Sequence, residues 1–256
     1  MKHGALVFLA TWALSAPAMA NDTPLSLFLA GEYSQAESTG EAANDAQGLA
    51  IAARAALADD QMRDAPCLDC IRRAEDLSRR AIAADPKQPE GHIYLAIAMG
   101  YETRIIGDLA AQSKDYANIA KRELDTAFAS DPNNPWTLAA LGGWHIEIVR
   151  GAGSALGRWI FGARLEKGEE YYEKALTIAP QNPVLHYQYA LALAGFDLST
   201  YQPDVEKELA RTIAQDPKSR FDTFVRARAQ QLLDVLKRGD MTEAKRLIRR
   251  DRGYPA

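Results

Sequence analysis

The chain has 256 residues, 47% of them hydrophobic and 25% charged, with a formal net charge of −4. This length is enough for one continuous hydrophobic core. Residues 218–256 hold eleven Lys or Arg against five Asp or Glu, an excess too modest and too poor in interleaved aromatic residues to predict nucleic-acid binding. We interpret it as a solvated helix face, with contact to an anionic surface or an acidic partner as the alternative.

Residues 1–20 predict a cleaved secretory signal peptide. Lys2 and His3 precede an apolar run from Ala5 to Leu14, and Ala18-Met19-Ala20 is a small-x-small cleavage signal. The run is shorter than the roughly 20 residues that span a membrane, and no later segment is apolar enough to do so. We therefore expect cleavage after Ala20 and a periplasmic or secreted protein with no transmembrane segment.

The rest of the chain predicts helices throughout. Residues 21–40 form a leader and a short helix over 25–36, interrupted at Gly31 and ended by Ser38-Thr39-Gly40. Ala and Leu dominate and β-branched runs are scarce, which favours an all-α fold with no sheet. The expected helices after the leader cover 41–57, 67–84, 89–106, 113–130, 135–149, 165–178, 183–194, 203–215, 220–237 and 241–250.

A recurring phrase separates these helices. It reads AIAADPKQP at 81–89, AFASDPNNP at 127–135, ALTIAPQNP at 175–183 and TIAQDPKSR at 212–220. The first Pro cannot continue a helix, Asp or Asn can cap the next one, and a second Pro suits a first helical turn. Self-similarity of this kind predicts stacked helical hairpins, which we assign to one domain over 41–256.

Small residues seven positions apart precede three of the phrases. They are Ala74 and Ala81, Ala120 and Ala127, and Gly168 and Ala175, with the pairs Leu95-Ala96, Leu141-Gly142 and Tyr189-Ala190 on the partner helices. In this pattern most of residues 41–238 resembles the tetratricopeptide-repeat (TPR) family. That resemblance implies a right-handed solenoid of helical hairpins with a concave groove. The fourth unit departs, because Val205 and Thr212 replace the small pair.

The hairpins are longer than the family's usual repeat of about 34 residues. Pro86 and Pro132 are 46 residues apart, and Pro132 and Pro180 are 48 apart, which predicts extended hairpins with longer helices or inserted elements. Residues 135–180 are similar to a hairpin of the regulator of microtubule dynamics family. The overall plan is similar to the T-component proteins of TRAP transporters, which are typically lipoproteins, although this chain lacks their anchoring Cys.

The insert at 151–163 carries an apolar helical face. Its members fall at helical spacing, at Ala152, Ala155, Leu156, Trp159, Ile160 and Ala163. Phe161 lies off this face, and four glycines loosen the backbone. The segment is either a mobile flap over a hydrophobic ligand pocket or a plug that fills the concave side as core.

Cys67 and Cys70 are the only cysteines. In an exported protein the pair predicts a structural disulfide, with redox activity or free thiols as alternatives. His92 and His186 occupy the same repeat position and are expected to pack. We predict no metal site and no cofactor, since no motif has the ligand spacing that either would need.

No nucleophile elbow, phosphate loop or paired-carboxylate motif appears, so we predict that the protein is not an enzyme. The leading hypothesis is an exported scaffold that binds a protein or peptide partner in its concave groove. The alternative is a periplasmic carrier of a hydrophobic small molecule or lipid, using the insert at 151–163. The candidate contact residues are Tyr94, Tyr101, Trp136, Trp144, His145, Trp159, Phe161, Tyr187 and Tyr189.

Overall fold

The computed structural model describes residues 23–255, and within them the protein is all-α, with no strand. The expected signal peptide at 1–20 lies outside these residues. The helices are α1 (Pro24–Ala30), α2 (Tyr33–Ala43), α3 (Ala46–Met62), α4 (Leu68–Ala84), α5 (Pro89–Ile106), α6 (Asp108–Ser113), α7 (Tyr116–Ser130), α8 (Pro135–Phe161), α9 (Leu165–Ile178), α10 (Pro183–Ala214), α11 (Arg220–Lys237) and α12 (Met241–Asp251).

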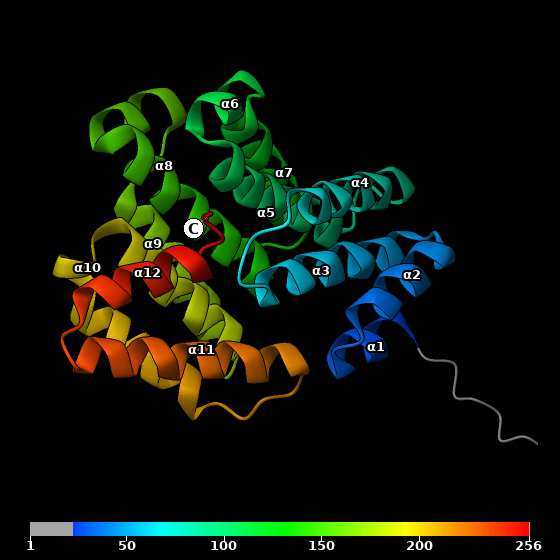
Figure 1. Ribbon diagram of the computed structural model, residues 1–256. Helices are drawn as coiled ribbons and strands as arrows, with labels where there is room; N and C mark the ends of the chain where they lie inside the picture. Colours follow the sequence, from blue (N-terminus) through cyan, green and yellow to red (C-terminus); the bar gives the residue numbers. More distant parts are fainter. Residues whose placement is uncertain (1–22, 256) are drawn as a thin grey trace, which may run out of the picture.

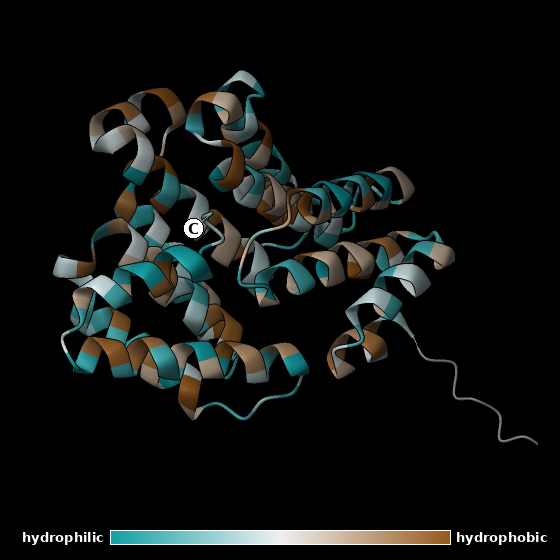
Figure 2. Ribbon diagram, in the orientation of Figure 1, coloured by the Kyte–Doolittle hydropathy of each residue, from teal (hydrophilic) through white to brown (hydrophobic). Residues whose placement is uncertain are grey.

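Consecutive helices form hairpins that follow one another in a curved array (Figure 1). Most helices are hydrophobic along one side and hydrophilic along the other (Figure 2), so each hairpin buries its apolar sides against its neighbours. The proline phrases lie at the predicted turns. A helix begins at each of the prolines Pro89, Pro135 and Pro183. The side chains of Asn134 and Asn182 accept hydrogen bonds from backbone N–H groups in the first turns of α8 and α10.

Small residues allow close helix contact inside the hairpins, as the sequence predicts. A Cβ on Gly142 would lie 2.8 Å from the carbonyl oxygen of Gly168, and one on Gly168 would lie 2.9 Å from that of Gly142. No larger residue fits at this crossing of α8 and α9. In the fourth unit Val205 and Thr212, which replace the small pair, are fully buried all the same.

The two ends of the array meet. One hydrophobic cluster joins Leu27, Phe28 and Tyr33 of the first two helices to residues of α10, α11 and α12. At this junction Gly31, which has φ +89°, packs so closely on Arg220 that a Cβ there would lie 2.5 Å from its Cγ. The last three helices therefore return to the beginning of the array, whereas an open repeat array would leave its two ends apart.

The two predicted packing histidines make the same contacts. The Nδ1 atoms of His92 and His186 lie 2.6 Å from carboxylates of Glu123 and Glu208. Their Nε2 atoms lie 3.0 and 2.9 Å from the carbonyl oxygens of Pro86 and Pro180. The imidazole of His92 thus links a proline turn to α7, and that of His186 links a proline turn to the second half of α10, beyond the kink at Asp197.

Several expected helix ends are wrong. Ser38-Thr39-Gly40 does not end a helix but lies inside α2, and the break comes at Asn44, which takes the left-handed conformation with φ 51°. The helix expected over 113–130 begins at Tyr116, after the separate helix α6. The helix expected over 135–149 continues to Phe161, across a kink at Gly153.

A further correction concerns α10. The second half of this helix begins at residue 198 instead of Pro203, because the carboxylate of Asp197 accepts hydrogen bonds from the backbone N–H groups of Ser199 and Thr200. Asp197 therefore caps the segment. The bounds expected over 89–106, 165–178 and 220–237 are confirmed.

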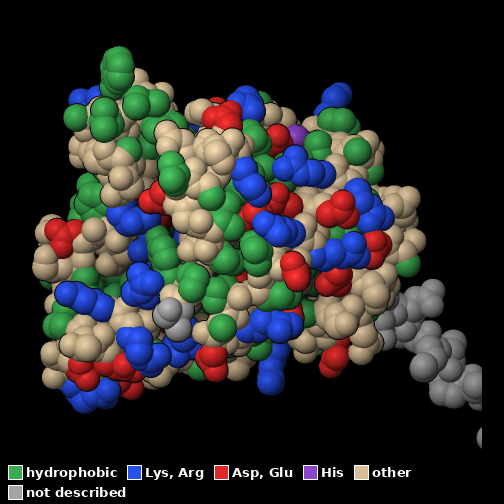
Figure 3. Space-filling model, turned by 45° about the horizontal axis from the view of Figure 1, so that its top comes forward, with side chains coloured by type: hydrophobic (Ala, Val, Ile, Leu, Met, Phe, Trp, Pro, Cys, Tyr) green, Lys and Arg blue, Asp and Glu red, His purple; other side chains and the backbone are tan. Residues whose placement is uncertain are grey.

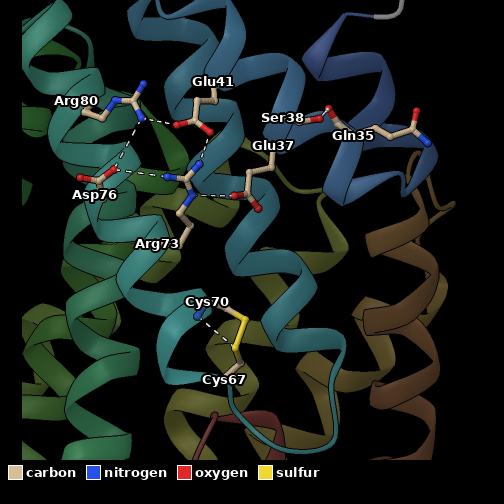
Figure 4. A network of polar contacts seen from close by, with 9 residues as sticks. All are labelled: Gln35, Glu37, Ser38, Glu41, Cys67, Cys70, Arg73, Asp76 and Arg80. Atoms are coloured by element: carbon tan, nitrogen blue, oxygen red, sulfur yellow. Dashed lines mark hydrogen bonds and ion pairs between the residues drawn. A yellow bond between two sulfur atoms is a disulfide. The ribbon is translucent and has the colours of Figure 1, made fainter.

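Cys67 and Cys70 form the predicted disulfide at the start of α4 (Figure 4). The backbone N–H of Cys67 donates to the carboxylate of Asp60 over 2.6 Å, which fastens the preceding loop to α3. Further along α4, Arg73 and Arg80 make ion pairs with Glu37 and Glu41 of α2 and with Asp76 (Figure 4). We call these five residues the outer ionic cluster.

Candidate functional site: a cavity on the concave side

The concave side forms a cavity of about 650 Å³ that is partly open to solvent. It is lined mainly by α3, α5, α7 and α8, with further residues from α1, α6, α10 and α11. Tyr254, beyond α12, also lines it, because the end of the described chain folds back to the centre of the molecule (Figure 1). The size and apolar lining are those of a small-molecule site.

Five of the nine candidate contact residues line this cavity: Tyr94, Tyr101, Trp136, Trp144 and Phe161. Trp144 is held in place, because its Nε1–H donates to the carbonyl oxygen of Ala117 over 2.9 Å. Tyr94 and Tyr101 are buried and their pKa values are raised by burial. Their phenols therefore remain neutral at physiological pH.

The other four candidates do not line it. Tyr187 belongs to the core and its hydroxyl donates to Asp251 over 2.6 Å, while Tyr189 stacks on Tyr172 with ring centroids 4.7 Å apart. His145 is buried, and its Nδ1 accepts from the backbone N–H of Arg164; burial lowers its pKa to about 4. These three residues have packing roles, and the fourth, Trp159, projects into solvent.

The insert at 151–163 is neither a simple flap nor a simple plug. Gly153, with φ 78°, bends α8 so that the last part of the helix turns over the cavity, where Ile160 and Phe161 line it. Most of the predicted apolar face points outward, since Trp159 is 83% exposed and Leu156 and Ile160 are 52% and 56% exposed. Hydrophobic side chains gather on this projecting end in the space-filling view (Figure 3).

A charged cluster that the sequence analysis missed lies in the cavity wall. The carboxylate of Glu147 lies 3.0 Å from Nε of Arg150 and 3.7 Å from Nη2 of Arg104, and it also pairs with Arg252. Nη2 of Arg150 donates to the hydroxyl of Tyr254 over 2.9 Å. We call Arg104, Glu147, Arg150 and Arg252 the inner ionic cluster; all but Arg252 line the cavity.

The inner ionic cluster contains more positive than negative charge. Burial by itself would raise the pKa of Glu147, but the guanidinium groups of Arg104, Arg252 and Arg150 outweigh it and lower the pKa to about 2. Glu147 is therefore ionised at any physiological pH. Arginine keeps its charge in proteins, so three positive charges meet one negative charge here.

The only sequence signal for the cluster is the i, i+3 spacing of Glu147 and Arg150, which is typical of a solvated helix face. Arg252 and Tyr254 come from the other end of the chain, so no local pattern could predict that they join these residues.

The chain matches no protein-family model, and no curated protein is detectably similar to it. Within residues 23–255, no helix has the length and hydropathy needed to cross a membrane. The same part of the chain contains no group of three or more His, Cys, Asp or Glu side chains placed to hold a metal ion.

Proposed function

We propose that this is a non-catalytic exported protein that holds the apolar part of a small amphipathic molecule in its central cavity. The observation that carries the proposal is the cavity of about 650 Å³, a volume within the range of ligand sites. Export is supported by the signal-peptide pattern at 1–20. The absence of a catalytic motif from the sequence favours binding over turnover.

The contact between the two ends of the array favours a small molecule over an extended peptide. An extended peptide runs along a groove or a sheet edge, whereas Phe28 of the first helix and Phe221 of α11 line the same cavity, so the two ends of the array converge on it. Rigid aromatic walls bind at little cost in side-chain entropy. They support a preformed pocket for a hydrophobic ligand.

A second candidate function, binding of a protein partner, rests on a different surface. Leu109 of α6 is 83% exposed, as is Trp159 on the distal part of α8. Exposed large apolar side chains that gather on one face are typical of interaction sites. The two functions are compatible, because Trp159 does not line the cavity.

Gly100 offers a direct test of the cavity. It lies on α5, lines the cavity, and has no atom within 4 Å of the position a Cβ would take. We expect Gly100→Leu to fold, since Leu has a higher helix propensity than Gly, and to occupy part of the cavity. Trp159→Ala is the matched control, an apolar change outside the cavity.

The measurements are native mass spectrometry of the purified protein and titration with the fluorescent probe 1-anilinonaphthalene-8-sulfonate. The wild type and Trp159→Ala should bind the probe equally, and Gly100→Leu should bind it at least about tenfold more weakly. Equal binding by a folded Gly100→Leu protein would refute the cavity as the ligand site.

A further inference from the structure

We propose that the cavity holds an anion site formed by Arg104 and Arg150, so that its ligand is an amphipathic carboxylate or phosphate with one hydrocarbon chain. This inference rests on the proposed function and specifies the chemical class of the ligand. It is carried by the juxtaposition of an unbalanced cationic cluster with apolar walls in one cavity.

The first step is the charge count. Among the described residues, the ion pairs of Arg104, Arg150 and Arg252 all go to one carboxylate, that of Glu147. The nearby carboxylate of Asp251 is already engaged by Arg228 and Arg250 and by the hydroxyl of Tyr187. The inner ionic cluster therefore carries two positive charges in excess.

The second step is accessibility. The side chains of Arg104 and Arg150 are only 19% and 29% exposed, and both line the cavity. Unpaired charges removed from bulk water are costly unless an opposite charge compensates them. An anion that enters the cavity would reach both guanidinium groups, whereas Arg252, 8% exposed and absent from the lining, stays behind Glu147.

The third step is that the arginines are held in position. Nη1 of Arg104 donates to the carbonyl oxygen of Arg252 over 3.0 Å, and its guanidinium carbon lies 4.9 Å from the ring centroid of Tyr101. Arg150 is fixed by Glu147 and by Tyr254. Preorganised guanidinium groups suit the planar oxygens of a carboxylate or the oxygens of a phosphate.

The fourth step is the surroundings. Ile148, next to Glu147 on α8, lines the cavity, as do Met99 and Ala96 on α5. Polar side chains such as Arg54, Asp108 and Gln188 line other parts of the cavity. A molecule that places its anion at Arg104 and Arg150 can lay a hydrocarbon chain along the apolar side chains beside them, which makes the ligand amphipathic.

The test compares probes that differ in the head group alone. Isothermal titration calorimetry with dodecanoate, dodecyl phosphate and dodecanol should give dodecanoate or dodecyl phosphate at least about tenfold tighter binding than dodecanol, the expected gain from charged hydrogen bonds. Acetate and inorganic phosphate, which lack the chain, should bind far more weakly; if they bind as tightly as the long-chain anions, the ligand is not amphipathic and the proposal fails.

Arg150→Gln removes one charge and keeps most of the side-chain length. It should abolish most of the preference for dodecanoate over dodecanol and leave dodecanol affinity unchanged, whereas Lys167→Gln, an exposed control on α9, should change neither. Arg104→Gln provides a second variant if Arg150→Gln does not fold.

The outcomes separate this inference from the proposed function. Equal affinity of the wild type for dodecanoate and dodecanol overturns the anion site and leaves the hydrophobic cavity standing. A loss of both affinities in folded Arg150→Gln also contradicts the anion site, because it would indicate a change of shape. If no long-chain probe binds the wild type, both proposals fail.

Discussion

Two ionic clusters connect helices in this protein, and they differ in both balance and location. In the outer ionic cluster two arginines of α4 meet three carboxylates at the protein surface (Figure 4). In the inner ionic cluster three arginines share the carboxylate of Glu147 beside the cavity. The side chains of the outer cluster are 28% to 59% exposed, and those of the inner cluster are 8% to 29% exposed.

The difference indicates which cluster needs an explanation beyond folding. Exposed ion pairs contribute little to stability and are tolerated in many combinations. A partly buried excess of positive charge is unfavourable in the protein alone, and arginine cannot lose a proton to relieve it. The inner cluster is therefore the better candidate for a site that is completed by a ligand.

The largest effect on stability is expected when the inner ionic cluster loses the carboxylate of Glu147. Glu147→Gln would leave three guanidinium groups without an anion, and we expect it to lower the free energy of unfolding by about 3 kcal/mol, as for other broken buried pairs. Urea denaturation at pH 7 measures this.

The pH dependence provides an independent check on Glu147. Its folded pKa of about 2 lies below the ordinary value of 4.5, so its contribution is fully present above pH 4.5 and is lost as the pH falls toward 2. The wild type should therefore lose stability in this range more steeply than Glu147→Gln does. Parallel pH profiles would contradict the assignment.

A second buried pair, Glu75 and Glu102, places two carboxyl groups near each other, and Arg79 pairs with the first while Arg72 and Lys114 pair with the second. Burial is the main cause that raises the pKa of Glu75 to about 7, and the neighbouring carboxylate of Glu102 raises it further. Glu102 is 1% exposed and lies 2.8 Å from Nζ of Lys114. One carboxylate keeps its charge while the other takes up a proton, a route that is closed to the arginines of the inner cluster.

Replacement of Glu75 is expected to give the next largest effect on stability. Because the folded pKa of Glu75 is raised, its contribution is full below about pH 4.5 and is lost as the pH rises through about 7. Glu75→Gln mimics the protonated form, so we expect it to be more stable than the wild type at pH 8.5, by about 2 kcal/mol, and nearly equal at pH 5. Thermal unfolding at both pH values measures the crossover, and a constant difference would rule out the raised pKa of Glu75.

The sequence could predict the array and the local parts of the cavity wall. Proline turns and small residues such as Gly142 and Gly168 act within one hairpin, so their spacing in the sequence reports their contacts. Tyr94, Tyr101 and Trp144 line the cavity because they lie on inner faces that helical periodicity can identify. Asn44 and Asp197 were missed because short polar side chains end or cap helices in ways that propensity does not locate.

The inner cluster could not be predicted, for a physical reason. Arg104, Glu147 and Arg252 lie on α5, on α8 and just after α12, and they meet because the last helices return to the start of the array. This return depends on the hydrophobic cluster that Phe28 shares with residues nearly 200 positions later. A repeat pattern records neighbours, and it carries no information about where the two ends of the array meet.

The smallest effect is expected in the outer cluster, and it tests the comparison itself. Arg73 is the centre of that cluster, with Nε 3.0 Å from the carboxylate of Glu37 and a side chain that is 37% exposed. Because water and salt screen such pairs, Arg73→Gln should cost less than about 1 kcal/mol, and the cost should shrink further at high ionic strength. Urea denaturation in low and high salt measures it beside Glu147→Gln.

Probe binding by Arg73→Gln should equal that of the wild type, since Arg73 does not line the cavity. A loss of stability as large as that of Glu147→Gln would mean that exposure does not separate the two clusters. The excess positive charge beside the cavity would then need no ligand to explain it, because ion pairs anywhere in this fold would carry comparable weight.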